Sequence, residues 1–314
     1  MRGRTIALLA AGGFGTMLVA SGVAIYALGQ RPDYSWRPEL AEHTYAVSGP
    51  TVVIDEAHNN ASTADLLGRY LPFANLLRAD GYLVERGHSA FTPPSLASAD
   101  VLVIVNAAGA RKAQIWGFNL PVPMEEDRDG PAFTAAEVEA VRAWVGQGGS
   151  LLLIADHAPF GAASASLAQA FGVAMHQGFV EVPGEASDPL VFERANNRLG
   201  DHVIVAGDSD GARITRVMTF TGQSLTGPPN AIPLLRLPQS AIEYVGTNDT
   251  LEAQPAGPVQ GLALEYGAGR IVVLGEAAML TAQVSNSEPF GMNLPDNDNK
   301  QFALNVLHWL SRAD

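Results

Sequence analysis

Ser150-Leu-Leu-Leu-Ile-Ala-Asp-His157 is the most informative stretch of this 314-residue sequence. Its apolar run follows Gly148-Gly149 and ends in two polar residues, Asp156 and His157. A short, continuous apolar run between turn signals is typical of a strand that is buried on both faces of a parallel sheet. The stretch therefore predicts a buried strand over residues 150–154, with polar side chains directly after it.

Further strands and helices are predicted around this run. Apolar runs at residues 51–54, 82–84 and 101–105 predict three earlier strands. A capping signature at Ser62 and Asp65 precedes Leu66, Leu67 and other apolar residues at helical spacing, which predicts a helix kinked by Pro72. A Thr134/Glu137 capping box predicts the start of another helix. This alternation predicts an α/β fold, with a mostly parallel sheet covered by helices on both faces.

The second half of the chain is richer in β-like pieces. Short apolar segments at residues 214–220, 231–237 and 242–245 are separated by Gly and Pro. Residues 261–266 and 270–274 flank Gly267-Ala-Gly269, which predicts a hairpin. Asp298 precedes a last helix with one apolar face. We therefore expect one α/β domain over residues 51–312, with β-rich additions in its second half.

Composition excludes several classes of function. The chain carries 32 acidic and 19 basic residues, a net charge of −13, and its Lys and Arg residues form no cluster, so nucleic acid is not expected as a partner. It contains no cysteine, which excludes disulfides, thiolate metal sites and a cysteine nucleophile. Asp55-Glu56-Ala57-His58 is spelled like a helicase box, but the sequence has no Gly-Lys pair for a phosphate-binding loop.

The N-terminus predicts export. An uncharged apolar run from Thr5 to Gly29 follows Arg2 and Arg4 and is long enough to cross a hydrocarbon core of about 30 Å. The positive charge before it predicts that the rest of the chain lies outside the cytoplasm. We expect residues 1–29 to be an inner-membrane anchor and the bulk of the chain to be periplasmic; a cleaved signal peptide and a secreted protein are the alternative. Residues 30–50, polar and rich in proline, are expected to be a linker or an edge segment.

Polar side chains follow the predicted strands. Because ligands bind beyond the carboxyl ends of parallel strands, we expect these side chains to meet at one rim of the sheet. Asp55, Glu56, His157 and Glu276 are the candidate catalytic residues. The candidate ligand-binding residues are His58, Asn59, Asn60, Asn106, Asp156 and Gln283. His58, Asp156 and His157 are also candidate ligands of a divalent metal. Alternatively, each of these residues caps a helix or fixes its own loop.

The order and spacing of five motifs resemble the class I glutamine amidotransferase-like superfamily, specifically an uncharacterised bacterial branch near trehalose-utilisation-type proteins. The motifs are Val52-Val-Ile-Asp-Glu-Ala-His58, Gly81-Tyr82, Gly148-Gly-Ser-Leu-Leu-Leu-Ile-Ala-Asp156, Tyr266-Gly-Ala-Gly-Arg-Ile-Val-Val-Leu-Gly275 and Asn305-Val-Leu-His-Trp-Leu310. The resemblance implies a flavodoxin-like sheet and, by analogy, a carbohydrate-like ligand. Members that hydrolyse glutamine carry a cysteine after the strand matching residues 151–155. This chain has Asp156-His157 there, so it is not a glutamine amidotransferase.

Two functions remain open at this point. The first is a membrane-anchored domain that binds a small polar, carbohydrate-like ligand at the rim of its sheet, with or without hydrolase activity and with or without a divalent metal. The second is a non-catalytic scaffold or accessory module of a membrane complex of the transporter type.

Overall fold

The computed structural model describes residues 30–40, 42–108, 112–115, 118–123, 130–186, 188–246 and 250–313. The predicted anchor, residues 1–29, lies outside this part of the chain. Within the part described, no helix combines the length and the apolar character needed to cross a bilayer.

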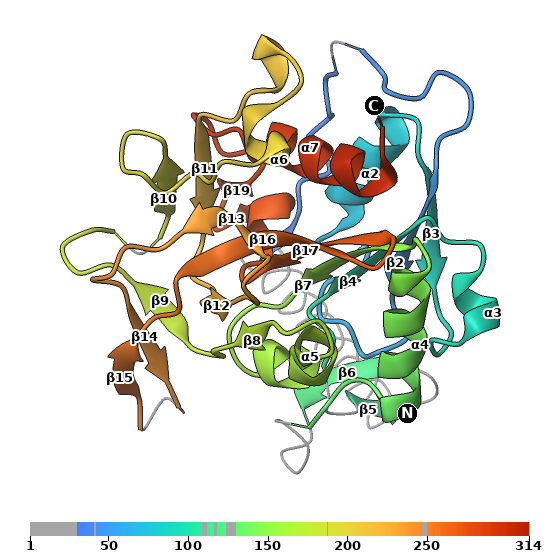
Figure 1. Cartoon of the computed structure of the whole chain (residues 1–314), viewed down its shortest axis with the longest axis horizontal. Helices are drawn as coiled ribbons and strands as arrows, with labels where there is room; N and C mark the ends of the chain where they lie inside the picture. Colours follow the sequence, from blue (N-terminus) through green and yellow to red (C-terminus); the bar gives the residue numbers. More distant parts are fainter. Residues whose placement is uncertain are drawn as a thin grey trace, which may run out of the picture.

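A nine-stranded mixed sheet forms the centre of the molecule (Figure 1). Five adjacent strands are parallel, in the order β3 (Leu83–Gly87), β2 (Thr51–Asp55), β4 (Val101–Val105), β7 (Ser150–Ile154) and β17 (Gly269–Leu274). Numbered along the chain, these five strands have the order 2-1-3-4-5, which is that of flavodoxin. The predicted α/β fold is therefore confirmed, and the strand expected at residues 150–154 has those bounds.

The sheet continues beyond β17 with antiparallel strands. Residues Val259–Tyr266 form β16, which pairs with β17 through the predicted hairpin at Gly267. The strands that follow are β12 (Leu225–Thr226) and β8 (Ala174–Met175), with β13 (Ile232–Arg236) on β16. These strands are the β-rich additions expected in the second half.

Two hydrophobic cores lie on opposite faces of the sheet. Side chains at alternating positions of the parallel strands, such as Leu152 and Leu153, belong to different cores. One core contains α2 (Leu71–Ala79) and α7 (Asn299–Ser311), and the other contains α3 (Pro93–Leu96), α4 (Ala135–Gly146) and α5 (Phe160–Gln169). Figure 1 shows α2 and α7 together on one side of the sheet and α4 and α5 on the other. The expected covering of both faces is confirmed.

Smaller sheets surround this centre. They are β1 (Arg31–Pro32) with β18 (Ala282–Ser285) and β19 (Glu288–Gly291), β9 (Phe179–Glu181) with β14 (Ile242–Val245) and β15 (Glu252–Pro255), β10 (Leu190–Glu193) with β11 (Arg216–Thr219), and β5 (Lys112–Ile115) with β6 (Phe118–Pro123). The short helices α6 (Val203–Ala206), η2 (Asp210–Ala212) and η3 (Ala278–Leu280) complete the fold. Because β1 pairs with β18, residues 30–50 begin as an edge strand of the domain rather than as a free linker.

The helix expected to run from the Ser62/Asp65 signature is shorter than predicted. It begins at Leu71, and Pro72 lies in its first turn instead of kinking its middle. Proline has no amide hydrogen to give to a preceding turn, so it suits the first turn of a helix, where amide hydrogens have no intrahelical partner. Asp65 accepts the amide of Leu67 (2.9 Å) and closes a local turn. As a result, Leu66 and Leu67 lie in a loop and not on a helix.

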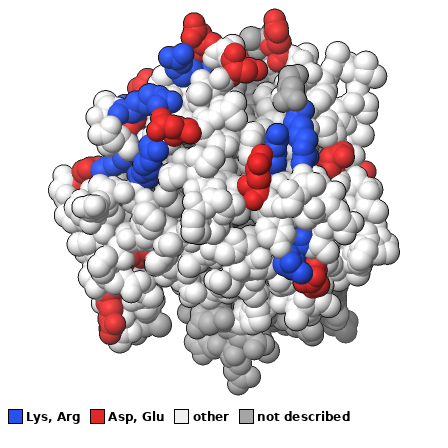
Figure 2. Space-filling model, in the orientation of Figure 1, with Lys and Arg blue, Asp and Glu red and all other residues white. Residues whose placement is uncertain are grey.

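Charged side chains form small groups of mixed sign on the face that Figure 2 shows, with broad uncharged areas between them. Ion pairs between described residues include Arg216–Glu193 (3.0 Å) and Arg236–Asp201 (3.3 Å). On this face, the described Lys and Arg side chains therefore lie close to acidic ones rather than in one basic patch.

Candidate functional site

The predicted site residues divide into two groups at the carboxyl ends of the parallel strands. One group surrounds His58 in the loop after β2. The other borders a pocket formed by the ends of β4, β7 and β18, together with η3. The single convergent site expected from the sequence is therefore two neighbouring sites with different chemistry.

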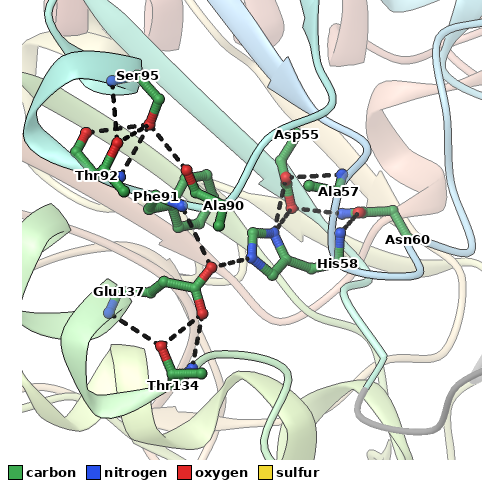
Figure 3. Close-up of polar contacts among 10 residues, drawn as sticks. All are labelled: Asp55, Ala57, His58, Asn60, Ala90, Phe91, Thr92, Ser95, Thr134 and Glu137. Atoms are coloured by element: carbon green, nitrogen blue, oxygen red, sulfur yellow. Dashed lines mark hydrogen bonds and ion pairs between the residues drawn. The ribbon is translucent and has the colours of Figure 1, made fainter.

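His58 lies between two carboxylates (Figure 3). Its Nδ1 donates to Asp55 at the end of β2 (2.9 Å to Oδ1), and its Nε2 donates to Glu137 Oε1 on α4 (2.8 Å). The ring is buried between Phe91 and Phe133, with centroid distances of 4.5 and 4.8 Å. The Asp55–His58–Glu137 cluster thus links the loop after β2 to the first turn of α4.

Further hydrogen bonds complete this cluster. Asn60 Nδ2 donates to Asp55 Oδ2 (3.1 Å) and to the carbonyl of Val105 (3.0 Å). The amide of Phe91 donates to Glu137 Oε1 (3.2 Å). Glu137 also belongs to the predicted capping box, in which its Oε2 accepts from the Thr134 hydroxyl (2.7 Å). These buried carboxylates are therefore well supplied with donors.

The electrostatics favour the charged form of the buried His58. Burial by itself lowers the pKa of His58, but the hydrogen bonds and negative charges of Asp55 and Glu137 outweigh it, and the pKa of His58 is raised. Burial acts to raise the pKa of Glu137, but hydrogen bonds from His58 and Thr134 bring it down to about 2. An imidazolium that donates from both nitrogens to ionised carboxylates has no lone pair for a metal or a proton.

The predicted metal ligands are not brought together. Both ring nitrogens of His58 are occupied, whereas Asp156 and His157 border the separate pocket. Among the residues that the structure describes, no group of three or more His, Asp or Glu side chains could hold a metal ion.

Glu56 and Asn59 also lie apart from the pocket. The carboxylate of Glu56 accepts from the amide of Ala64 (2.8 Å) and from Arg86 Nε on β3 (2.9 Å), and so fixes the loop after β2. Asn59 has a positive φ of 52° in this loop, a conformation that Asn tolerates better than most residues. The predicted functional residues after β2 are therefore not among the residues that line the pocket.

The pocket, called the rim pocket below, has a volume of about 390 Å³. It is lined by four of the predicted residues, Asn106, Asp156, His157 and Gln283, and by residues that include Gln30, Ser62, Arg69, Phe160, Asp188, Phe220, Thr221 and Phe290. Asn106 has a φ of 47°, and its Oδ1 accepts the amide of Asp156 (2.9 Å). This bond joins the ends of β4 and β7 at the floor of the site.

The tautomer of His157 is fixed by the main chain. Its Nδ1 donates to the carbonyl of Ala158 (2.9 Å), because a carbonyl oxygen can only accept. The neutral ring therefore carries its lone pair on Nε2, which lies 3.9 Å from Asp156 Oδ1, beyond hydrogen-bond distance. Phe179 stacks on the ring with a centroid distance of 4.1 Å and holds its orientation. His157 thus presents a preorganised acceptor in the pocket wall.

Asp156, half-buried at the rim pocket, and the buried Glu276 form a pair of carboxyl groups. Burial raises the pKa of Asp156, against the opposing effects of His157 and Arg69. Burial and the negative charge of Asp156 raise the pKa of Glu276 well above its usual value. Glu276 lies behind the pocket wall, where it accepts the amides of Ala278 (2.7 Å) and Met279 (2.8 Å) at the start of η3. Its observed contacts are therefore those of a helix-terminus acceptor.

Gln283 has an unusual hydrogen-bonding state. Its side chain is 1% exposed, and its Nε2 donates to Thr281 Oγ1 (2.7 Å). Its Oε1 is buried and has no hydrogen-bond partner among the described residues. A buried carbonyl without a donor costs about 1–3 kcal/mol, so such atoms are rare in proteins and call for an explanation.

Sequence reasoning missed several residues of both sites. Glu137 carried only a capping signal, which says nothing about a distant partner. Arg69 and Asp188 line the rim pocket, but no pattern in the sequence marks them. Phe220 and Phe290 lie in its wall with a centroid distance of 4.2 Å and their rings tilted by 41°; Phe220 comes from a segment with only a short β-like signal, and Phe290 from one with none.

Comparisons with known proteins give structural matches only. No family model and no curated protein sequence matches the chain. The mmIFT52 N-terminal domain has a TM-score of 0.54 at 15% identity, covering 83% of this chain and 97% of that domain. A ThuA-like protein from Bacteroides uniformis has a TM-score of 0.43 at 11% identity, covering 87% of this chain and 95% of the other. A GMP synthase-like protein from Thermoplasma acidophilum has a TM-score of 0.42 at 10% identity, covering 84% and 95%. At 15% identity, the match to the mmIFT52 domain shows a shared fold alone.

Proposed function

We propose that the rim pocket binds a small polar ligand, in a class I glutamine amidotransferase-like domain that lacks the cysteine of its catalytic relatives. The observation that carries this proposal is the open rim pocket, whose wall contains Asp156, His157 and Gln283, the last with a buried Oε1 that has no donor among the described residues. Oε1 is closed to solvent as the side chain stands, so a ligand donor would remove the cost of leaving that atom unpaired once the side chain turns toward the pocket. The strand order and the motifs around residues 148–156 support the choice of superfamily.

The chemistry of the wall favours a ligand that is rich in donors. The carboxyl group of Asp156 and Nε2 of His157 can accept hydrogen bonds, as can Gln283 Oε1 once its side chain turns toward the pocket. Phe220 and Phe290 add apolar ring surface on the same pocket. A polyhydroxylated, carbohydrate-like molecule combines hydroxyl donors with C–H faces that pack on aromatic rings, and we propose this class as the ligand.

Calorimetry and ligand-observed NMR with defined probes test the proposal. The probes are trehalose, glutamine and succinate, which differ in donors, acceptors and charge. We expect trehalose to bind and succinate to fail, because the wall already carries carboxylates. Gln283→Met keeps the size of the side chain but removes its amide, and we expect it to weaken binding by about tenfold, the equivalent of roughly 1.4 kcal/mol.

Gln254→Met on the exposed strand β15 is the matched control and should leave binding unchanged. Binding of a probe with equal affinity to wild type and to both Gln283→Met and His157→Ala would contradict the rim pocket as its site. Binding of none of the probes, with stable co-purification of a membrane protein that both variants retain, would instead favour the scaffold alternative.

Hydrolysis is a second candidate function. It is favoured by His157, whose fixed tautomer leaves Nε2 able to accept a proton from a water molecule beside a bound substrate. Turnover of p-nitrophenyl glycosides that is lost in His157→Ala, but kept in the control His88→Ala, would support it. A metal-dependent reaction would need ligands other than His58, because both nitrogens of that ring are engaged.

We also propose that residues 1–29 anchor the chain in the inner membrane and that the domain lies in the periplasm. The support is the uncharged run from Thr5 to Gly29 behind Arg2 and Arg4. Vesicle flotation of the full chain tests the anchor. Release of full-length protein by a salt wash would contradict it.

A further inference from the structure

Two adjacent leucines are exposed in the loop between β2 and α2. Leu66 and Leu67 are 72% and 67% exposed, and Tyr34, at 37%, is also among the exposed large hydrophobic residues. The hydroxyl of Tyr34 donates to the carbonyl of Leu66 (2.8 Å), so these three residues belong to one surface. We call it the Tyr34–Leu66–Leu67 patch. Adjacent exposed leucines leave apolar surface in water, so they are a candidate contact surface for something apolar.

The loop that carries the leucines is held in place. Asp65 Oδ1 accepts the amide of Leu67 (2.9 Å), and the carbonyl of Thr63 accepts the amide of Tyr70 (2.9 Å). Glu56 accepts the amide of Ala64 (2.8 Å) and pairs with Arg86, which ties the loop to β2 and β3. The backbone therefore presents both leucines outward in a defined geometry.

The patch lies where the predicted anchor joins the domain. The sequence is uncharged from Thr5 to Gly29, and the described chain resumes at Gln30, whose Oε1 accepts from Arg69 Nη1 (3.0 Å). In the sequence, the short strand β1 and Asp33 separate Gln30 from Tyr34, the first residue of the patch. Tyr34 and Trp36 follow the uncharged run at the spacing at which aromatic residues lie in the headgroup layer of a bilayer. The length of apolar chain outside the described part, and the point where it ends, thus favour lipid as the occupant of the patch.

We propose that the Tyr34–Leu66–Leu67 patch rests on the bilayer surface, with Leu66 and Leu67 inserted among the lipid headgroups. This proposal depends on the membrane anchor but not on any ligand of the rim pocket. Two other side chains of the same loop, Ser62 and Arg69, line the rim pocket, as does Gln30. Contact of the patch with lipid therefore places the mouth of the rim pocket beside the membrane.

Single-cysteine labelling tests the proposal in the full chain, which has no cysteine of its own. Leu66→Cys and Leu67→Cys are labelled with an environment-sensitive fluorophore, and the protein is reconstituted in vesicles of phosphatidylethanolamine and phosphatidylglycerol. The control is Val203→Cys, at a residue that is 53% exposed. Val203 lies in α6 and lines a pocket together with Trp309, near the end of α7, and Arg270, at the start of β17. The control therefore lies at the opposite edge of the sheet.

We expect the labels at positions 66 and 67 to be quenched by spin-labelled lipid and to lose accessibility to iodide, with a blue shift in emission. The label at position 203 should stay accessible to iodide, without quenching by spin-labelled lipid and without a blue shift in emission. Chain that floats with vesicles while positions 66 and 67 stay open to iodide would overturn the patch proposal and leave the anchor standing. Chain that does not float overturns both. Labels shielded from both quenchers would also overturn the proposal, since protein rather than lipid would then cover the patch.

Discussion

Two carboxylates stabilise the positively charged form of His58 inside the protein. Asp55 alone would balance the charge, so the second partner, Glu137, makes the cluster negative overall. Such an arrangement holds together two segments that lie far apart in the sequence, the loop after β2 and the start of α4. Breaking one partner of a buried ion pair is costly because the remaining charge loses its compensation.

Glu137→Gln tests this contribution at the level of one residue. Glutamine keeps the shape of the side chain and can still serve in a capping box, but it removes a charged acceptor from His58 Nε2. We expect a loss of about 2 kcal/mol in the free energy of unfolding, the typical value of a hydrogen bond to a charged group. Denaturant titration measures it, with Glu139→Gln on the exposed side of α4 as a nearly silent control. Equal stability of the two variants would contradict a stabilising role for the cluster.

The raised pKa of His58 predicts the pH dependence of stability. The imidazolium is favoured in the folded state, so its contribution is complete below pH 6.5, its ordinary pKa, and is lost as the pH rises through the folded-state pKa. Glu137 acts on the acid side: its contribution is present above pH 4.5 and is lost as the pH falls toward its folded-state pKa of about 2. We expect the difference in unfolding free energy between wild type and His58→Gln to decline above neutral pH. A difference that grows with alkaline pH would have the wrong sign.

At the scale of elements, the start of α4 combines local and distant functions. Thr134 caps the helix, and its hydroxyl also holds Glu137 Oε2 (2.7 Å), which leaves Oε1 toward His58. The capping box was predictable because it depends on two residues three positions apart. Its link to His58 was not, because nothing in a local pattern specifies which side chain from a distant segment lies against a helix terminus. The predicted start of α2 was wrong for a related reason. The helical spacing of the leucines gives no information about the turn at Asp65, which keeps the backbone out of a helical conformation there.

Thr134→Ala should therefore lower the free energy of unfolding by more than the loss of an ordinary N-cap does. Loss of an N-cap typically costs about 1 kcal/mol, and here a loosened Glu137 adds to it. The comparison is Thr92→Ala at the capping box of α3, whose hydroxyl is hydrogen-bonded to Ser95 in the same turn and to no other residue in the described part of the chain. Thermal and denaturant unfolding of both variants measure the difference, and Thr134→Ser should restore most of the loss. A larger loss in Thr92→Ala would contradict the coupling between this cap and His58.

At the scale of the whole molecule, the parallel centre was predictable and the division of the site was not. Strands buried on both faces appear in the sequence as continuous apolar runs, so β4 and β7 could be located to within a residue. The polar residues after the strands do meet at one edge, but whether a side chain turns into a pocket or into a neighbouring carboxylate depends on loop conformation. His58 and His157 look alike in the sequence. The fold places His58 between two carboxylates that favour its charged form, whereas it leaves Nε2 of His157 available as an acceptor.

Rates of amide hydrogen exchange should differ between the parallel centre of the molecule and its edge. All five residues of β4 and of β7 are buried between the two cores, whereas all four residues of β15 are exposed at an edge. We expect amides of β4 and β7 to exchange only through global unfolding and those of β15 to exchange through local opening, orders of magnitude faster. Mass spectrometry of peptides from the two regions measures the rates. Comparable protection would contradict a single stable centre.

Gln283 has a consequence for how this protein can change over evolutionary time. We expect mutation alone to replace an interior amide of this kind, because leucine is a single base change away and leaves no buried carbonyl unpaired. A lineage that keeps the amide must therefore retain it for a reason other than the stability of the fold. Orthologues that retain the Asp156-His157 pair should therefore retain glutamine or an equivalent at position 283, and lineages that have lost the pair should drift to apolar residues at that position.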